Sequence, residues 1–244
     1  MDGMDADGQY AGTASWHRGR RGAWRWGAVA WLAVAVLGAG GARAGDFAAL
    51  AGADTKAGYL ARLLINETPF PGERGYVSEE DTESAMRSVL FVLHSRIKDI
   101  PAGYKQEEIA AVRTGDILDI VTARNQCEGF SRDAAGNRTM APRVGERINY
   151  LMKIANSGKA PGRFARLINY AQSLATAYFA TGPQGQDLFA NLSVVGGVPV
   201  TGRAYSWMTG QDMYHPGGNF VRIPESQHGL LGGNRFFTLR KDPK

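Results

Sequence analysis

Cysteine and histidine are scarce in this chain of 244 residues, which holds one cysteine, Cys127, and four histidines. A single cysteine excludes an intrachain disulfide, so side-chain packing has to stabilise the fold. The three histidines beyond residue 44 are His94, His215 and His228, and they show no paired spacing of the kind that holds a metal. We therefore expect no metal ion and no other cofactor.

Neither sign of charge dominates the chain. Lys and Arg number 28 against 23 Asp and Glu, and the first 44 residues hold five of these basic and three of these acidic residues, which leaves a net charge of +3 beyond them. No stripe of basic residues with interleaved aromatics, the pattern of nucleic-acid binders, is present. We expect no nucleic-acid partner, and the oligomeric state stays open.

Long hydrophobic runs are missing too, since a membrane span needs roughly 18 to 20 apolar residues. The apolar run over residues 27–37 is shorter, follows an arginine-rich stretch over residues 17–26, and precedes Ala42-Arg43-Ala44. This order of charged, apolar and small residues is typical of a secretory signal peptide. We predict a signal peptide over residues 1–44 and a single domain over residues 45–244, periplasmic or secreted and without a stable membrane span. Retention of the apolar run as a tether is the alternative.

Apolar residues recur at three- and four-residue steps through much of the chain up to residue 181. This periodicity predicts helices over residues 46–67, from Asp81 to before Pro101, and over residues 106–112, 114–123 and 163–181, with Asp81 and Thr114 as N-caps. Residues 124–144 are predicted to form a polar loop. Beyond Pro183 glycines and aromatics increase and the helical spacing ends, so we expect loops and short strands there. The fold class predicted is mainly α (α+β), with an irregular Gly-rich C-terminal part.

Glu67 is the sharpest candidate for chemistry. It lies on the apolar face of the first predicted helix with Leu63 and Leu64, at the end of that helix and directly before a proline-rich loop. Burial and the negative end of the helix dipole both raise the pKa of a carboxyl group. A carboxyl group that stays protonated near neutral pH can protonate a glycosidic oxygen. The alternative is a helix-end glutamate paired with Arg62 or Arg74.

Several segments resemble, in the same order, the motifs of SleB-type cell-wall hydrolases, the spore cortex-lytic family. In that family a helix ends in a catalytic Glu, a Gly-Glu loop and a second helix follow, and later come a Gln-Phe-Ser motif and a Gly-x-His-x-Phe-Tyr ending. The counterparts here are residues 61–67, Gly72-Glu73, residues 85–90, residues 94–97, Gly129-Phe130-Ser131 and residues 232–237. The chain differs from the family in having two extra residues before Gly72, Gly129 in place of glutamine and Asn234 in place of histidine.

The resemblance implies a lysozyme-like helical fold that acts on peptidoglycan glycan strands, between N-acetylmuramic acid and N-acetylglucosamine. Glu67 is then the general acid of a lytic transglycosylase or a muramidase. A hydrolase also needs a second acid or a positioned water, for which Glu73, Asp81 and Glu128 are candidates; we favour a single carboxylate, with no cofactor.

Substrate contacts are expected at a further set of positions. Asn66, Gln126 and Ser131 can hydrogen-bond acetamido groups, and Phe130 and Asn234 occupy motif positions. Aromatic side chains of the C-terminal part can stack on sugar rings, and the candidates are Tyr205, Trp207, Tyr214, Phe220 and Phe236.

Two hypotheses from other classes stay open. Cys127 with His215 or His228 could form the thiol and base of a cell-wall amidase or peptidase, although an apolar helix start does not follow the cysteine. The replaced glutamine and histidine instead fit a non-catalytic peptidoglycan-binding protein on a decayed enzyme scaffold.

Overall fold

The computed structural model describes residues 46–209 and 215–243, and the statements below concern these residues. All described residues belong to one compact unit. The predicted signal peptide and Tyr214 lie outside the described residues. Within the described part, no helix is both long enough and apolar enough to cross a bilayer.

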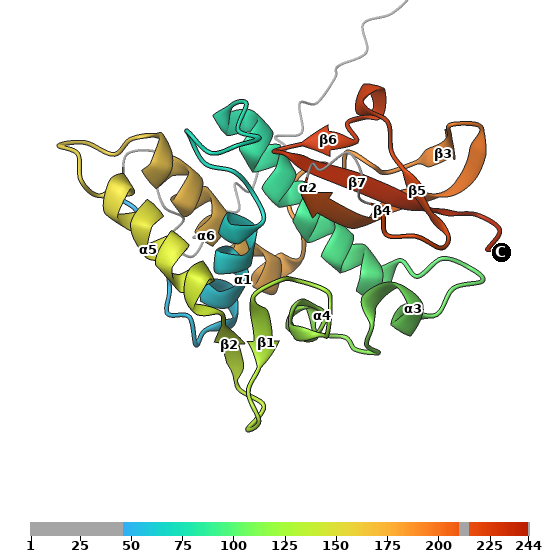
Figure 1. The fold of residues 1–244 in the computed structure, drawn as a ribbon, viewed down its shortest axis with the longest axis horizontal. Coiled ribbons are helices and arrows are strands. Elements are labelled where there is room, and N and C mark those ends of the chain that lie inside the picture. The colour runs from blue at the N-terminus through green and yellow to red at the C-terminus, as the bar shows by residue number, and fades with distance from the viewer. Residues whose placement is uncertain (1–45, 210–214, 244) are drawn as a thin grey trace, which may run out of the picture. The chain divides into compact units, whose positions relative to one another are not determined.

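Six α-helices precede most of the strands (Figure 1). They are α1 (Lys56–Asn66), α2 (Glu79–Lys98), α3 (Gln106–Ala110), α4 (Ile117–Thr122), α5 (Pro142–Ala155) and α6 (Arg163–Thr181). Helix α6 has the predicted bounds. The N-cap of α2 is Ser78, whose side chain accepts a hydrogen bond from the Asp81 backbone N–H, and the N-cap of α4 is Asp116. Asp81 and Thr114 were therefore the wrong caps.

Helix α1 is shorter than the predicted 46–67, because the residues before it bind to other helices in an extended form. The backbone N–H groups of Ala48 and Ala49 donate to the side-chain oxygens of Asn156 and Asn169. Thr55 then caps α1 by accepting a hydrogen bond from the Gly58 N–H.

The prediction of a polar loop over residues 124–144 is also wrong in part. This segment contains the hairpin β1 (Phe130–Arg132) and β2 (Arg138–Met140) and the start of α5, a helix that the spacing did not lead us to predict.

The C-terminal part forms an antiparallel five-stranded sheet. Its strands are β3 (Leu192–Val195), β4 (Val198–Thr209), β5 (Phe220–Arg222), β6 (Leu230–Leu231) and β7 (Asn234–Arg240), with a short 3₁₀ helix, η1 (Glu225–Gln227), between β5 and β6. The spatial order is β3-β4-β7-β5, and β6 pairs with β7. The register of β4 and β7 sets Trp207 opposite Phe236 and Thr209 opposite Asn234.

This sheet corrects the predicted fold class: the described fold is α+β and is not specifically lysozyme-like. Period-two alternation, the usual sign of a strand, is missing because both faces of the central strands are covered. All four residues from Ala204 to Trp207 are buried, as are the residues of β7 from Asn234 to Leu239. Register shifts around Ala204 interrupt the pattern further.

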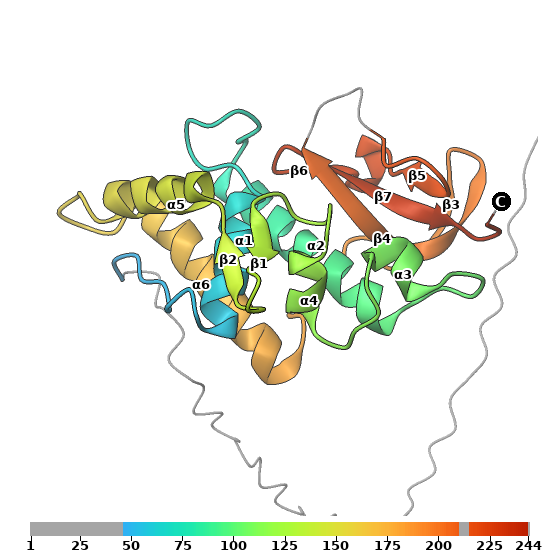
Figure 2. The same cartoon turned by 60° about the horizontal axis from the view of Figure 1, so that its bottom comes forward.

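One apolar core joins the helices to the sheet. Helix α1 packs against α5 and α6, while α2 packs against both α6 and β4 (Figures 1 and 2). Leu64 of α1, Leu93 of α2, Trp207 of β4 and Phe236 of β7 all belong to this core. Helix α2 contacts β6, and Asn234 of β7 donates a hydrogen bond to the carbonyl of Glu67 at the end of α1. The end of α1 therefore lies close to strands that come more than 150 residues later in the chain.

Candidate active site

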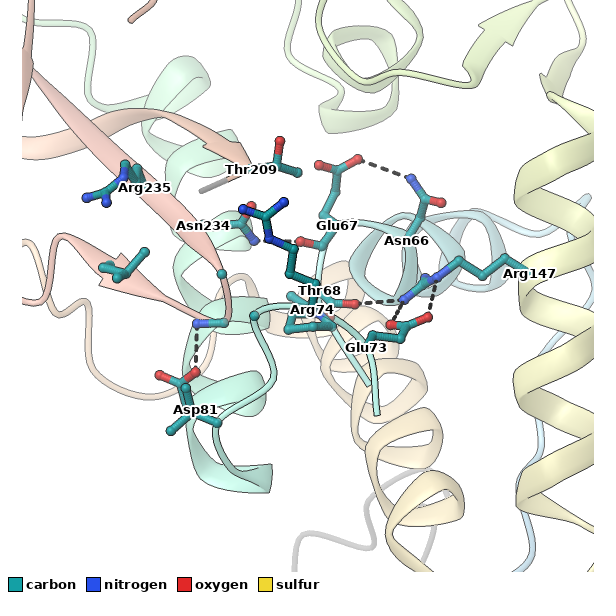
Figure 3. Close-up of a pocket in the computed structure, with 16 residues that line it drawn as sticks. Asn66, Glu67, Thr68, Glu73, Arg74, Asp81, Arg147, Thr209, Asn234 and Arg235 are labelled. Atoms are coloured by element: carbon teal, nitrogen blue, oxygen red, sulfur yellow. Dashed lines mark hydrogen bonds and ion pairs between the residues drawn. The ribbon is translucent and has the colours of Figure 1, made fainter. Parts of the chain in front are cut away.

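A cavity of about 720 Å³ lies where the end of α1, the loop after it, the start of α2 and the β6–β7 turn meet (Figure 3). Ten of its sixteen lining residues carry polar or charged side chains. The lining residues are Asn66, Glu67, Thr68, Pro69, Glu73, Arg74, Gly75, Val77, Asp81, Arg147, Thr209, Leu230, Gly232, Gly233, Asn234 and Arg235.

Glu67 reaches this cavity as the C-cap of α1. Its backbone N–H donates to the Leu63 carbonyl at 2.9 Å, and the buried Thr68 hydroxyl donates to the Leu64 carbonyl at 2.8 Å, so the end of the helix is closed on both sides of Glu67. From β7, the Asn234 amide donates to the Glu67 carbonyl oxygen at 2.5 Å. The side chain of Glu67 is therefore carried by a backbone fixed by both the helix and the sheet.

Burial raises the pKa of the Glu67 carboxyl above its ordinary value of 4.5, and this is the largest influence on it. Hydrogen bonds from Trp207 and Asn66 act in the opposite direction, and the negative charge of Glu128 adds to the rise. Arg62, which the sequence offered as an ion-pair partner, instead donates to the carbonyls of Ala51 and Gly58. Burial thus favours the protonated form of Glu67 over the carboxylate.

Trp207 and Asn66 hydrogen-bond the two oxygens of the Glu67 carboxyl group unequally. The indole Nε1–H donates to Glu67 Oε2 at 2.9 Å. An indole N–H can only donate, so Oε2 must accept. Oε1 accepts the Asn66 amide only at the long distance of 3.4 Å. Oε1 is therefore the less strongly engaged oxygen and the better position for a proton.

Trp207 is itself held by a buried arginine. The Arg96 guanidinium lies 5.3 Å from the centre of the Trp207 ring, donates through Nε to the Tyr205 carbonyl at 2.7 Å, and donates through Nη1 to Gln126 Oε1 at 2.7 Å. Burial lowers the pKa of Arg96 to about 10. This value is still well above neutral pH, so the guanidinium stays charged. A fixed cation over the ring is a favourable cation–π contact, and it orients the indole N–H toward Glu67.

Arg147 fixes the loop that follows Glu67. It comes from α5, forms a two-pronged ion pair with Glu73, and donates to the carbonyls of Ile65 (2.7 Å) and Thr68 (3.0 Å). Glu73 also accepts the Phe70 N–H at 2.7 Å. Because α5 was not predicted, Arg147 was missed; its place in an amphipathic stretch was the only signal for it.

Asp81 lines the part of the cavity formed by the β6–β7 turn, away from Glu67 (Figure 3). Its Oδ2 accepts the Gly232 N–H at 2.8 Å, and burial raises the pKa of Asp81. The turn approaches the loop after α1 so closely that a Cβ at Gly75 would lie 2.9 Å from the Gly233 Cα. Both glycines have a positive φ, so this contact requires glycine.

Some of the other predicted site residues line the cavity, and the rest do not. Asn66 and Asn234 line the cavity with Glu67, whereas Gln126 does not line it and accepts a hydrogen bond from Arg96 instead. Phe130 is buried edge-on against Tyr59.

Ser131 lies on the exposed hairpin, hydrogen-bonded to Thr139, and Tyr205 is buried with its hydroxyl on the Asp99 carbonyl. Neither lines the cavity. Of the candidate second acids, Glu128 is exposed and paired with Arg143, while Glu73 and Asp81 lie in the cavity wall. Trp207, expected to stack on sugar, is instead the partner of Glu67.

Cys127 does not have the surroundings of a nucleophile. It is buried in the core, and burial raises the pKa of its thiol, which disfavours the thiolate. Within residues 46–209 and 215–243 no hydrogen bond links Cys127 to a histidine. His215 accepts the Gly217 N–H and packs on Phe237.

The described part of the chain contains no group of His, Cys, Asp and Glu that could hold a metal ion.

Comparisons with protein-family models, with curated proteins and with solved structures found no match to this chain.

Proposed function

We propose that this protein cleaves the glycosidic bond between N-acetylmuramic acid and N-acetylglucosamine in peptidoglycan, with Glu67 as the single general acid and base. The observation that carries the proposal is the state of Glu67. It is a carboxyl group at a cavity wall, its pKa is raised by burial, and one oxygen is occupied by the Trp207 N–H. The resemblance to SleB-type hydrolases supplies the substrate.

These contacts support the following course of reaction. Glu67 Oε1–H protonates the glycosidic oxygen as the bond to the muramic C1 breaks, and the sugar that leaves carries that proton. The carboxylate that forms is stabilised by the N–H groups of Trp207 and Asn66. It then takes the proton of the muramic C6 hydroxyl while that oxygen bonds to C1, which gives a 1,6-anhydro end and restores the acid.

A single carboxylate accounts for the chemistry better than a pair. Glu73 is held by Arg147 and by the Phe70 N–H, and Asp81 is held by the Gly232 N–H. Neither is therefore well placed to activate a water for an inverting or retaining hydrolysis. A lytic transglycosylase needs no second acid, so we favour it over a muramidase.

Digestion of purified sacculi tests the proposal. Wild type is expected to release muropeptides with anhydro ends, detected by mass spectrometry, and Glu67→Gln to release them at least about 1,000-fold more slowly. Glu80→Gln is the matched control, because Glu80 is exposed on α2 and does not line the cavity.

The products distinguish the alternatives. Reducing ends would indicate a muramidase, and free peptides would indicate an amidase. Binding of sacculi without any turnover by wild type would favour the non-catalytic alternative, and equal rates for both proteins would exclude Glu67 as the acid.

A further inference from the structure

The arginines of the cavity wall are not equivalent. Arg147 is occupied by Glu73 and two carbonyls, and Arg235 forms an ion pair with Glu225. Arg74 is exposed, and no residue of the described part of the chain forms a hydrogen bond or an ion pair with it. Figure 3 shows its side chain extended over the cavity, on the side where Thr209 and Asn234 lie.

The backbone that carries Arg74 is nevertheless held in place. On one side, Glu73 is fixed by Arg147 and by the Phe70 N–H, and its carbonyl accepts the Tyr76 N–H at 3.2 Å. On the other side, Gly75 packs against Gly233. An arginine on a fixed loop, with no partner for its guanidinium among the described residues, is prepared for a ligand, since little backbone ordering has to accompany binding.

The surroundings of Arg74 favour an anionic ligand. Of the carboxyl groups in the wall, Glu73 is already paired, Glu67 has a raised pKa, and Asp81 lies at the turn, held by Gly232. A guanidinium matches the two oxygens of a carboxylate. Val77 and Leu230 are exposed large apolar residues on the same wall, and they suit short aliphatic groups beside that carboxylate.

We propose that Arg74 forms a subsite for a carboxylate-bearing peptide substituent on the sugar whose bond is cleaved. The subsite rests on the proposed function, because the sugar has to lie with its glycosidic oxygen at Glu67. In peptidoglycan the substituent is the peptide attached to the lactyl group of muramic acid. The protein then acts on peptide-bearing glycan strands in preference to strands from which an amidase has removed the peptides.

Kinetics on the two kinds of strand test the preference. Wild type should show the lower KM on peptide-bearing strands. Arg74→Gln should raise that KM about fivefold, the equivalent of about 1 kcal/mol, with little change in kcat, and should bring the KM ratio of the two strands toward one. Lys153→Gln, which removes an exposed charge on α5 outside the cavity, should keep the wild-type ratio. An unchanged KM ratio in Arg74→Gln would overturn the subsite.

A binding measurement keeps this test separate from that of the proposed function. Glu67→Gln is titrated with N-acetylmuramyl-L-alanyl-D-isoglutamine and with its neutral amide, and NMR shifts are followed. Tighter binding of the acid, lost in the double variant with Arg74→Gln and weakened by salt, supports the subsite even if wild type cleaves nothing. Equal affinity for the acid and the amide, or no binding of either, rejects it even if the strands are cleaved.

Discussion

At the residue scale, the proposed reaction places two opposite requirements on Glu67. Before the proton transfer, its carboxyl group would have to keep a proton near neutral pH, which burial favours. After the transfer, the carboxylate would have to be tolerated, which the Trp207 N–H favours. The two influences act on one group, so removing either should change the pH dependence of activity in a defined direction.

Trp207→Phe should move the alkaline limb of the pH–rate profile upward. The lost N–H stabilises the carboxylate, so the pKa of Glu67 rises further and the acid form persists to higher pH. We expect kcat at the optimum to fall about tenfold, because the carboxylate formed in the reaction loses a hydrogen bond. Phenylalanine keeps an aromatic ring under Arg96.

Tyr205→Phe is the control for this change, since it removes a buried hydroxyl from the same strand without touching Glu67. It should lower stability and leave the alkaline limb in place. An alkaline limb that stays unchanged in Trp207→Phe would contradict the role of the indole.

Cys127 should be dispensable for activity. Its thiol is buried and its pKa is raised, so Cys127→Ala should keep the product pattern and cost about 1 kcal/mol of stability from lost packing. Iodoacetamide should label the thiol only after the protein is unfolded. Loss of turnover in Cys127→Ala, with the fold intact by circular dichroism, would restore the amidase hypothesis.

The position of a single residue could be predicted where the pattern of its own segment determines it. Glu67 lies on the apolar face and at the end of its own helix, so its position at the end of α1 could be predicted from the sequence. The role of Trp207 depends on a strand 140 positions away and on the buried Arg96, which no local pattern records. Asn234 was placed only by the resemblance.

At the element scale, the site depends on how α1 ends. Arg147 from α5 binds the last turn of α1 and the loop beyond it, and the Gly75–Gly233 contact brings the β6–β7 turn against the same loop. The position of Glu67 is thus set by elements that come after it in the chain.

Arg147→Ala should destabilise the protein by about 2 to 3 kcal/mol in urea unfolding, because Glu73 loses its partner and two carbonyls lose their donor. Activity should fall as well, since the loop loosens. Arg143→Ala on the same helix removes an exposed pair with Glu128 and should cost less than about 1 kcal/mol. Equal costs for both variants would contradict the role of Arg147.

Helices could be predicted better than strands for a physical reason. Helix α6 has a continuous apolar stripe ended by Gly182, and its bounds were predicted correctly. Short strands were predicted beyond Pro183, but their bounds and pairing were not, because β7 and the stretch of β4 from Ala204 to Trp207 are buried on both faces and β4 is irregular in register. Helix α1 was predicted too long because its preceding residues are held by side chains of α5 and α6.

At the scale of the whole molecule, one core unites the helices and the sheet, so an unfavourable charge on Glu67 lowers the stability of the whole fold. In the folded protein the pKa of Glu67 is raised above 4.5. At a pH between 4.5 and this raised pKa, the folded protein keeps the Glu67 proton, whereas the unfolded chain has released it. Stability therefore falls as the pH rises from about 4.5 through the folded pKa.

Glu67→Gln cannot titrate and should escape this loss. Thermal unfolding should show the variant and the wild type responding similarly near pH 4, and the variant gaining stability relative to wild type as the pH rises to 8. Glu80→Gln, at an exposed position, serves as the control and should show no such divergence. A constant difference between Glu67→Gln and wild type across this range would mean that the carboxyl is ionised in both states.

The proposed function requires that Glu67 remains a carboxylic acid near neutral pH, and titration of its side-chain carboxyl carbon by NMR measures this directly. The signal is assigned by its absence in Glu67→Gln and followed from pH 3 to pH 9. We expect a midpoint well above the ordinary 4.5, and a further rise in Trp207→Phe. A midpoint at or below 4.5 would rule out Glu67 as a general acid near neutral pH, because the carboxylate would then have no proton to give.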